Sequence, residues 1–217
     1  MMEIRSYRDR EHAGRVLALL IGRDYKEGVV MAIPNGGVAV GIEISRRLGF
    51  GFALLVVRKL HVPWNRESGF GAITPDGAFC INDELVRELG LKRSDILKIT
   101  GEELNEIVAR VKKYRADLPD ITGRTVFLVD DGLASGYTMI AAIQMARKLK
   151  AGKIIVAVPT ASASAAEKIT AVADGLICPN VREGSYFAVA DAYENWYDLT
   201  DDEVEKRLGN AGFPGGK

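Results

Sequence analysis

The chain has 217 residues, and its 29 lysines and arginines balance its 29 aspartates and glutamates, so the formal net charge is zero. This balance argues against a general attraction to nucleic acid or to acidic membranes and confines any anion site to a local patch. The length suits one domain with a well-covered core, no apolar run reaches membrane-spanning length, and no signal-peptide pattern opens the chain. Cys80 and Cys178 lie in unrelated apolar surroundings, which favours reduced thiols in a cytoplasmic protein over a disulfide.

The first predicted elements are a helix, a strand and a second helix. Apolar residues recur at helical spacing between positions 13 and 21, after a weak capping-box pattern at residues 6–9. Residues 29–33 are typical of a buried strand, and Asn35, Gly36 and Gly37 follow before another helix begins. Paired glycines let the backbone approach an anion closely, although alone they are ordinary turn punctuation. In an open α/β sheet such turns gather at the carboxyl ends of the strands, where ligands bind.

A second apolar strand is predicted at residues 52–57 and ends in Arg58 and Lys59. These cations could lie on a solvated edge, but we favour a position at the mouth of an anion site. Residues 60–79 are rich in Gly, Pro and polar residues and are long for a passive connector. We expect a lid hairpin at 59–81, with a plain surface hairpin as an equal alternative.

Within the predicted lid, segments 69–73 and 78–81 would pair across a turn at 75–77, and Arg66 or Glu67 would enter the closed site. A charged stretch with helical spacing follows at residues 83–115, and we recognise no set of catalytic side chains in it. We expect Asn82 to cap its first helix and a capping box at residues 100–103 to open a longer one. This segment, 82–117, is interpreted as a helical insertion or a dimer surface.

The most informative stretch begins at the apolar run 126–129, which is typical of a strand buried on both faces. Asp130 and Asp131 stand at its carboxyl end, a small-residue loop follows, and Thr138 opens a helical segment. The order is therefore strand, loop and helix, with acids at the strand end. An ordinary βα turn with an acidic start is the alternative.

The composition of this loop favours a sugar phosphate. Gly132 and Gly136 permit positive φ angles that let N–H groups converge on an anion, while Ser135, Thr138 and the helix start add donors. The two acids would repel phosphate, but they can accept hydrogen bonds from sugar hydroxyls or lie beside a hard cation. A phosphorylated ribose carries all of these groups.

This stretch resembles the phosphoribosyl-pyrophosphate (PRPP) motif of the type I phosphoribosyltransferases, with two acids after a strand and a small-residue loop closed by Gly-x-Thr. No P-loop lysine and no G-x-G-x-x-G pattern competes with it. Arg58-Lys59, the Gly-Phe-Gly-Ala at 69–72 and the helix ending in Tyr114-Arg115 precede the motif in one order. Together they resemble the bacterial and archaeal phosphoribosyltransferases of unassigned substrate, from residue 8 to about 204.

The resemblance implies a reaction: transfer of 5-phosphoribosyl from Mg²⁺–PRPP to a nitrogenous base, with release of pyrophosphate. The family's short loop after the first core strand often holds a non-proline cis peptide and binds pyrophosphate. Asp130 and Asp131 would bind the ribose hydroxyls and Mg²⁺, directly or through water, and with Arg58 and Lys59 they are the expected catalytic residues. The pyrophosphate ligands would be Asn35, Gly36, Gly37, Arg58 and Lys59. The 5-phosphate ligands would be Gly132, Leu133, Ala134, Ser135, Gly136, Tyr137 and Thr138.

Further strands at 154–159 and 176–178, with a helix at 163–173 between them, complete a mainly parallel sheet flanked by helices. The resemblance makes this the type I phosphoribosyltransferase fold, with a flexible lid hairpin and a C-terminal hood. We expect one domain at 1–209, a hood and final helix at 179–209, and a disordered tail at 210–217. In the hood, Tyr186 and Phe187 are the weak candidates for stacking on a base, although most aromatic residues there would be core.

One departure bears on the substrate: family members acting on 6-oxopurines usually carry Asp where this chain has Ala134. The loop is closer to the adenine-using type, and the base stays open. The alternative function is a PRPP-binding regulator without turnover. We expect neither a spare DNA-binding domain nor, from the zero net charge, a general attraction to DNA, and this favours the enzyme. A phosphatase with Asp130 as nucleophile is a weaker third option.

The expected partners are PRPP and a nucleobase, without nucleic acid or membrane. A homodimer is one open option, because members of the family are often dimers.

Overall fold

The computed structural model describes residues 6–184 and 186–213, with the backbone alone at residues 66 and 67. Its centre is a parallel sheet, as the sequence predicts. In spatial order the strands are β2 (Gly51–Leu54), β1 (Val29–Ala32), β6 (Thr125–Val129), β7 (Lys153–Ala157) and β9 (Gly175–Ile177). Each neighbouring pair of these strands is parallel.

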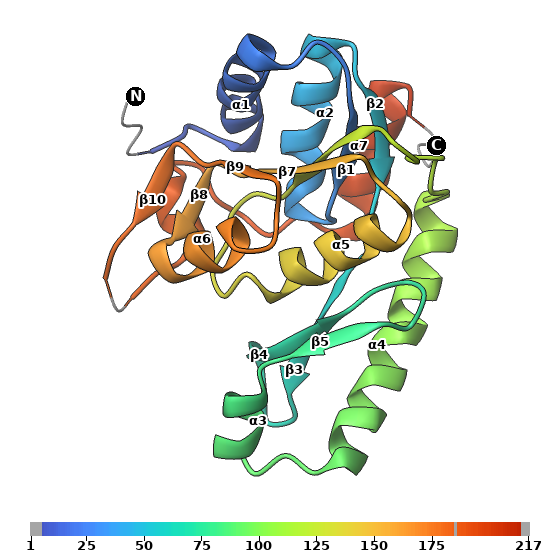
Figure 1. Ribbon diagram of the computed structural model, residues 1–217, viewed down its shortest axis with the longest axis vertical. Helices are drawn as coiled ribbons and strands as arrows, with labels where there is room; N and C mark the ends of the chain where they lie inside the picture. The colour runs from blue at the N-terminus through green and yellow to red at the C-terminus, as the bar shows by residue number, and fades with distance from the viewer. Residues whose placement is uncertain (1–5, 185, 214–217) are drawn as a thin grey trace.

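Helices cover both faces of this sheet (Figure 1). One face carries α1 (Arg10–Asp24), α2 (Gly36–Leu48) and α7 (Asp201–Ala211), and the other carries α5 (Tyr137–Lys148) and α6 (Ala163–Thr170). Strands covered on both faces are continuously apolar, and every residue of β1 and the residues 126–129 of β6 are buried. The prediction of a mainly parallel sheet flanked by helices is confirmed.

The order of the strands determines where a ligand site can form. The chain leaves β1 through α2 to reach β2 on one side, and it leaves β6 through α5 to reach β7 on the other. Ala32 and Val129, the last residues of β1 and β6, are paired. The direction of winding therefore reverses between these strands, and in open α/β sheets the crevice at such a point binds ligands.

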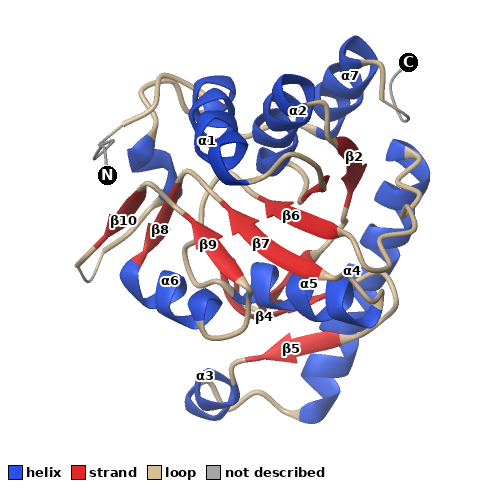
Figure 2. Cartoon of the chain, turned by 45° about the horizontal axis from the view of Figure 1, so that its top comes forward, coloured by secondary structure: helices blue, strands red, loops and turns tan. Residues whose placement is uncertain are grey.

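A second sheet lies beneath α5 and consists of β3 (Arg58–Val62), β4 (Asn65–Ile73) and β5 (Phe79–Ile81) (Figure 2). The predicted hairpin across residues 75–77 is confirmed, because Gly71, Ala72 and Ile73 pair with Ile81, Cys80 and Phe79. The sheet packs between α5 and the insertion helix α4 (Arg93–Tyr114), and Phe70 and Ile73 are fully buried. Within the predicted lid, the turn at Pro63 and Trp64 is exposed, and so are Lys59 and the second turn near Asp76. The side chains of Arg66 and Glu67 lie outside the described residues.

The helical insertion contains α3 (Asp83–Glu88), capped by Asn82 as predicted, and α4. The predicted helix start at residues 100–103 is wrong, because α4 begins at Arg93 and runs unbroken through them. Asp95 instead caps the start of this helix by accepting a hydrogen bond from the backbone N–H of Lys92, 2.9 Å away. Apolar residues on one face of α4 continue across residue 100, so packing overrides the local capping signal.

The C-terminal region contains β8 (Thr160–Ser162), β10 (Asn180–Arg182), the short 3₁₀ helix η1 (Val189–Ala192) and α7. The predicted tail begins too early, because α7 extends to Ala211 and the ring of Phe213 stacks on Phe52 at 4.4 Å. Residues 214–217 lie outside the described part of the chain. The N-terminal helix is confirmed, but its cap is Asp9, whose carboxylate accepts from the backbone N–H of His12 at 2.6 Å.

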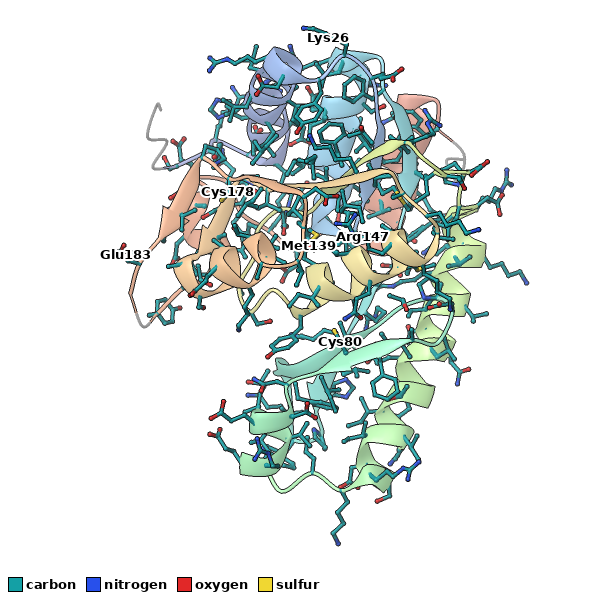
Figure 3. The ribbon with its side chains drawn as sticks, viewed as in Figure 1. Lys26, Cys80, Met139, Arg147, Cys178 and Glu183 are labelled. Carbon is teal, nitrogen blue, oxygen red and sulfur yellow. The ribbon has the colours of Figure 1, made fainter. Side chains whose placement is uncertain are left out.

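Both cysteines are free thiols (Figure 3). Cys80 lies on β5 and donates to the backbone oxygen of Tyr137, whereas Cys178 follows β9. Burial raises the pKa of Cys178 to about 11 and also raises that of Cys80, so both thiols are unreactive at neutral pH. Among the described residues, no helix combines the length and apolar character needed to cross a membrane.

Candidate active site at the carboxyl ends of β1 and β6

The glycine loop after β1 and the acidic loop after β6 touch each other. A Cβ atom built on Gly36 would overlap the carboxylate of Asp131, and one built on Gly37 would lie 2.6 Å from the backbone oxygen of Val129 and 2.9 Å from Cα of Asp130. Only glycine permits this approach. Two segments about a hundred positions apart, which the sequence predicts as parts of one site, are therefore brought together.

The loop between β6 and α5 presents a row of backbone N–H groups. Gly136 has φ of 83°, as predicted, and directly precedes α5. Within residues 6–184 and 186–213, the N–H groups from Ala134 to Thr138 make no hydrogen bond, and neither do the hydroxyls of Ser135 and Thr138. Unpaired amides at a helix start attract anions. This arrangement suits a phosphate.

Two residues of the predicted phosphate loop have other roles. The N–H of Leu133 donates to the backbone oxygen of Thr160 at 2.9 Å, and the Leu133 side chain is buried, so this residue belongs to the core. Gly132 lacks the positive φ predicted for it. It is instead required by close packing, because its Cβ would lie 2.6 Å from Cγ1 of Val189. The open amides of residues 134–138 form the main part of the predicted cradle, and the N–H of Gly132 also makes no hydrogen bond among the described residues.

Asp130 and Asp131 form a strained electrostatic pair. Burial, and then the charge of Asp131, raise the pKa of Asp130 well above its ordinary value of 3.8. Burial also raises the pKa of Asp131, although the guanidinium of Arg10 opposes this shift. A cation or several hydroxyl donors placed beside the pair would relieve both penalties. The site therefore favours a ligand that brings such groups.

Arg10 compensates part of this charge. Its Nε lies 2.8 Å from Oδ2 of Asp131, its Nη1 donates to the backbone oxygen of Tyr197 at 2.8 Å, and its guanidinium stacks 3.9 Å from the ring centre of Trp196. The Arg10 side chain is only 6% exposed. Sequence reasoning missed this residue. Its spacing could have indicated that it is buried, because Arg10 lies on the same face of the helix as the apolar residues Ala13 and Leu17.

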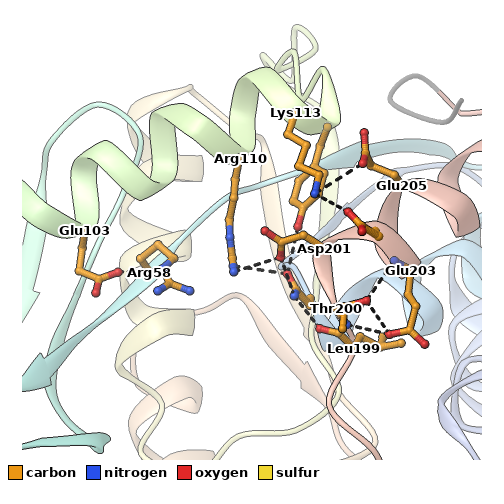
Figure 4. Close-up of polar contacts among 12 residues, drawn as sticks. Arg58, Glu103, Arg110, Lys113, Leu199, Thr200, Asp201, Glu203 and Glu205 are labelled. Carbon is orange, nitrogen blue, oxygen red and sulfur yellow. Dashed lines mark hydrogen bonds and ion pairs between the residues drawn. The ribbon is translucent and has the colours of Figure 1, made fainter.

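The predicted role of Asn35 as a pyrophosphate ligand is not supported for its side chain. The amide Nδ2 donates to the backbone oxygen of Leu199 at 2.8 Å and to Oδ1 of Asp201 at 3.0 Å. The amide oxygen accepts from the Tyr114 hydroxyl and from Arg110. Figure 4 shows Arg110 of α4 extending toward Asp201. The peptide bond between Pro34 and Asn35 is cis, as the resemblance leads one to expect.

Arg58 and Lys59 are not at the end of a core strand, which corrects the sequence prediction. β2 ends at Leu54, and these two residues open β3 in the second sheet. Nε of Arg58 lies 2.8 Å from Oε2 of Glu103, whose other oxygen lies 3.0 Å from Nδ1 of His61. Glu103 is buried and requires a compensating charge, which Arg58 supplies. Lys59 is exposed, with the stem of its side chain against Gly69.

The two weak base-binding candidates differ in exposure. Tyr186 is 81% exposed, and Phe187 is partly buried beside η1. Tyr193 and Trp196, from the same aromatic stretch, instead pack with Tyr7 and Arg10. Tyr193 and Trp196 therefore support the acidic loop, because Arg10, which they contact, pairs with Asp131.

The geometry is that of a known family. Residues 74–192 match the family model described as a phosphoribosyl transferase domain, which is more than half of the chain. The chain belongs to the phosphoribosyltransferase family. The recognition made from the sequence is thus confirmed.

Two Mycobacterium tuberculosis proteins, from strains CDC 1551 / Oshkosh and H37Rv, are provisionally named as phosphoribosyl transferases, and both resemble this chain. Each is 37% identical over 206 residues, which is 94% of this chain and 46% of the relative. The chain thus spans about half the length of these curated relatives.

Among solved structures, the chain is similar to TT1426 from Thermus thermophilus, with 32% identity, a TM-score of 0.76 and coverage of 94% of this chain and 97% of that one. AQ2163 from Aquifex aeolicus, with 14% identity, a TM-score of 0.51 and coverage of 80% and 75%, shares the fold alone. The fold is the type I phosphoribosyltransferase fold expected from the sequence.

The described residues contain no cluster of three or more side chains able to hold a metal ion by themselves. Asp130 and Asp131 offer carboxylate oxygens of the kind that Mg²⁺ prefers, and Mg²⁺ commonly binds through one or two carboxylates together with substrate phosphates. Burial, and then the charge of Asp131, raise the pKa of Asp130, and a cation beside the pair would oppose both effects. The donor set therefore fits a magnesium ion that arrives with an anionic substrate.

Proposed function

We propose that this chain transfers a 5-phosphoribosyl group from Mg²⁺–PRPP to a nitrogen of a base and releases pyrophosphate. The observation that carries the proposal is the contact between the Gly36–Gly37 turn and the Asp130–Asp131 pair, beside the open amides of residues 134–138. These three features match the three parts of PRPP: the diphosphate, the ribose and the 5-phosphate. Family membership supports the same reaction class.

Each part of the substrate would be held by groups of the appropriate charge. The amides from Ala134 to Thr138, with the hydroxyls of Ser135 and Thr138, would bind the 5-phosphate at the start of α5. Asp130 and Asp131 would accept hydrogen bonds from the ribose hydroxyls. Arg10 would keep Asp131 ionised and correctly oriented through their 2.8 Å contact.

The leaving pyrophosphate would lie against the backbone of Gly36 at the start of α2, where the helix end favours an anion. The N–H of Gly36 makes no hydrogen bond among the described residues, whereas the N–H of Gly37 already donates to the backbone oxygen of Ile33 at 3.1 Å. Lys59 stays a proposed ligand that would reach the pyrophosphate from the second sheet. We assign Arg58 to Glu103 instead. Bound magnesium, held through Asp130 and Asp131 and the substrate oxygens, would supply neutralising charge for the diphosphate.

The chemistry requires no protein nucleophile. The bond from the anomeric carbon to the pyrophosphate oxygen breaks, a bond from that carbon to the acceptor nitrogen forms, and the nitrogen loses its proton. Positive charge builds on the ribose ring, where Asp130 and Asp131 would stabilise it. Catalysis would therefore rest on positioning and electrostatics. The tip of the hairpin at residues 63–69 is the proposed lid, and it would exclude water from the reacting carbon.

The acceptor and the biological setting are also proposals. Ala134 leaves the loop without the acid expected for 6-oxopurines, and Tyr186 and Phe187 stay weak proposals for stacking on a base. We propose a cytoplasmic enzyme that acts on small molecules, with a homodimer as one possible assembly. Because the chain spans about half the length of the curated relatives, these proposals concern this chain and not the whole of those proteins.

The test is a pyrophosphate-release assay with Mg²⁺, PRPP and a panel of purine, pyrimidine and amine acceptors, including adenine, hypoxanthine and orotate. Release that depends on one acceptor supports the enzyme. PRPP binding without release for any acceptor would favour the regulatory alternative. Absence of both binding and release would contradict the proposed function. An Asp130→Asn variant is the matched inactive control.

A further inference from the structure

The side-chain amide of Asn35 has its hydrogen-bonding capacity filled. A primary amide has two donors and two acceptor lone pairs. Nδ2 of Asn35 donates to Leu199 and Asp201, and Oδ1 accepts from the Tyr114 hydroxyl at 3.3 Å and from Nη1 of Arg110 at 3.4 Å. Figure 4 labels three of these partners, Leu199, Asp201 and Arg110. The side chain of Asn35 is therefore held on both sides by hydrogen bonds. We call Asn35 and its four partners the clamp, and it fixes the point at which the turn at 36–37 begins.

The four partners come from two elements outside the central sheet. Arg110 and Tyr114 lie one turn apart on α4, and Leu199 and Asp201 flank the residue that caps α7. A contact of 3.1 Å between Nη2 of Arg110 and Oδ1 of Asp201 closes the arrangement. The insertion helix and the C-terminal helix therefore meet at the glycine turn.

This clamp lies largely away from water. The Tyr114 side chain is fully buried, and the Arg110 side chain is 17% exposed. Nε of Arg110 is buried without a hydrogen-bond partner among the described residues. Such an unpaired donor is unfavourable for folding. Because this arrangement costs stability, we infer that Arg110 has a functional role in addition to any structural one.

The charges persist at neutral pH. Partial burial by itself would raise the pKa of Asp201, but its side-chain contacts with Tyr114 and Asn35 and the charge of Arg110 outweigh burial and lower that pKa. Asp201 is also the first residue of α7, where the helix dipole favours an anion. The ion pair is therefore present under the conditions in which a phosphorylated substrate would bind.

We propose that Arg110 and Asp201 are positioning residues for the pyrophosphate-binding turn. Acting through Asn35, they fix the backbone of Gly36 and Gly37 against the acidic pair before any ligand arrives. The inference rests on the proposed function, which assigns pyrophosphate to this turn, and it gives the helical insertion and α7 a part in substrate binding. Preorganised donors avoid the loss of conformational entropy on binding, so loosening the clamp should weaken affinity for the group bound there.

The experiment measures binding of two separate probes, inorganic pyrophosphate and ribose 5-phosphate, each with Mg²⁺, by calorimetry. Arg110→Gln and Asp201→Asn should weaken pyrophosphate binding about tenfold or more, because the turn loses its anchor. Both variants should bind ribose 5-phosphate within about twofold of the parent chain, since the 134–138 cradle is untouched. Tyr114→Phe removes a single hydroxyl and should weaken pyrophosphate binding about threefold.

Lys113→Gln is the matched control. Lys113 joins α4 to α7 through Asp202 at 2.7 Å and Glu205 at 3.6 Å without touching Asn35. This variant should leave binding of both probes unchanged.

Three results would overturn the inference: unchanged pyrophosphate binding in Arg110→Gln, equal loss of both probes, or a parent chain that binds ribose 5-phosphate but no pyrophosphate. A parent chain that binds neither probe and no PRPP would overturn the proposed function, and the inference with it.

Discussion

The carboxylate of Asp131 lies against Gly36, leaving no room for a Cβ on that glycine. Arg10 anchors the carboxylate, so the acid cannot swing away freely. Gly36→Ala should therefore displace either Asp131 or the start of α2, weakening PRPP binding at least tenfold and destabilising the fold by about 1–3 kcal/mol. Calorimetry with Mg²⁺–PRPP and urea denaturation measure the two effects.

Gly101→Ala is the control for this substitution. Gly101 lies inside α4 with open space where its Cβ would be, so alanine should stabilise the chain by up to about 1 kcal/mol and leave PRPP binding unchanged. Equal PRPP affinity in Gly36→Ala and the parent chain would show that the two loops do not share a ligand.

Asp130→Asn should stabilise the ligand-free protein while removing PRPP binding. The pKa of Asp130 is raised above 3.8 in the folded chain, so the folded state retains a proton that the unfolded state has released. Stability of the parent should fall as pH rises from about 4 through the raised pKa, then level off. The variant should show a smaller fall, because only the raised pKa of Asp131 remains, and it should gain about 1 kcal/mol at pH 7. Parallel stability curves from pH 4 to 8 would contradict the burial argument.

Arg10→Met should leave Asp131 buried without its partner, with a loss of about 3 kcal/mol in unfolding free energy and weaker PRPP binding. Adding Asp131→Asn should recover more than about 1 kcal/mol of that stability, because the unpaired charge is removed with its partner. The control is Arg15→Met on the same helix, where a looser 4.0 Å contact to Glu43 predicts a change below about 0.5 kcal/mol. Strictly additive effects of the two substitutions at 10 and 131 would refute the coupling.

Arg58→Gln tests whether this residue supports the fold instead of binding pyrophosphate. The variant should lose about 2 kcal/mol of stability, because Glu103 would be buried without its cation, and Arg58→Gln with Glu103→Gln should regain about half of this. PRPP affinity should change less than about threefold. A tenfold loss of affinity at unchanged stability would restore the pyrophosphate role predicted from the sequence.

Local patterns predicted the elements that carry their own signal. The apolar run of β6, the acids that follow it and the small-residue loop are contiguous, so strand, turn and helix could be identified from residues 126–138 alone. The glycine turn after β1 was found in the same way, and parallel strands place both turns at one edge of the sheet.

Long-range charge pairing was beyond the reach of these patterns. Arg10 and Asp131 are separated by 121 positions, and Arg58 and Glu103 by 45, so no local spacing indicates that they meet. Asn35 was assigned by its place in a turn, but its side chain is bound by α4 and by the start of α7. The apolar run at residues 52–57 does not show that the chain leaves the main sheet after Leu54. For this reason the positions of Arg58 and Lys59 were predicted incorrectly.

The central claim is that the turn at 36–37 and the loop at 130–138 form one site for PRPP. Calorimetric titration of Mg²⁺–PRPP into the parent chain tests it most directly. The account predicts one site per chain, with tighter binding than either ribose 5-phosphate or pyrophosphate shows alone, because both ends of PRPP are held at once. No measurable binding, or affinity no greater than that of ribose 5-phosphate, would contradict it.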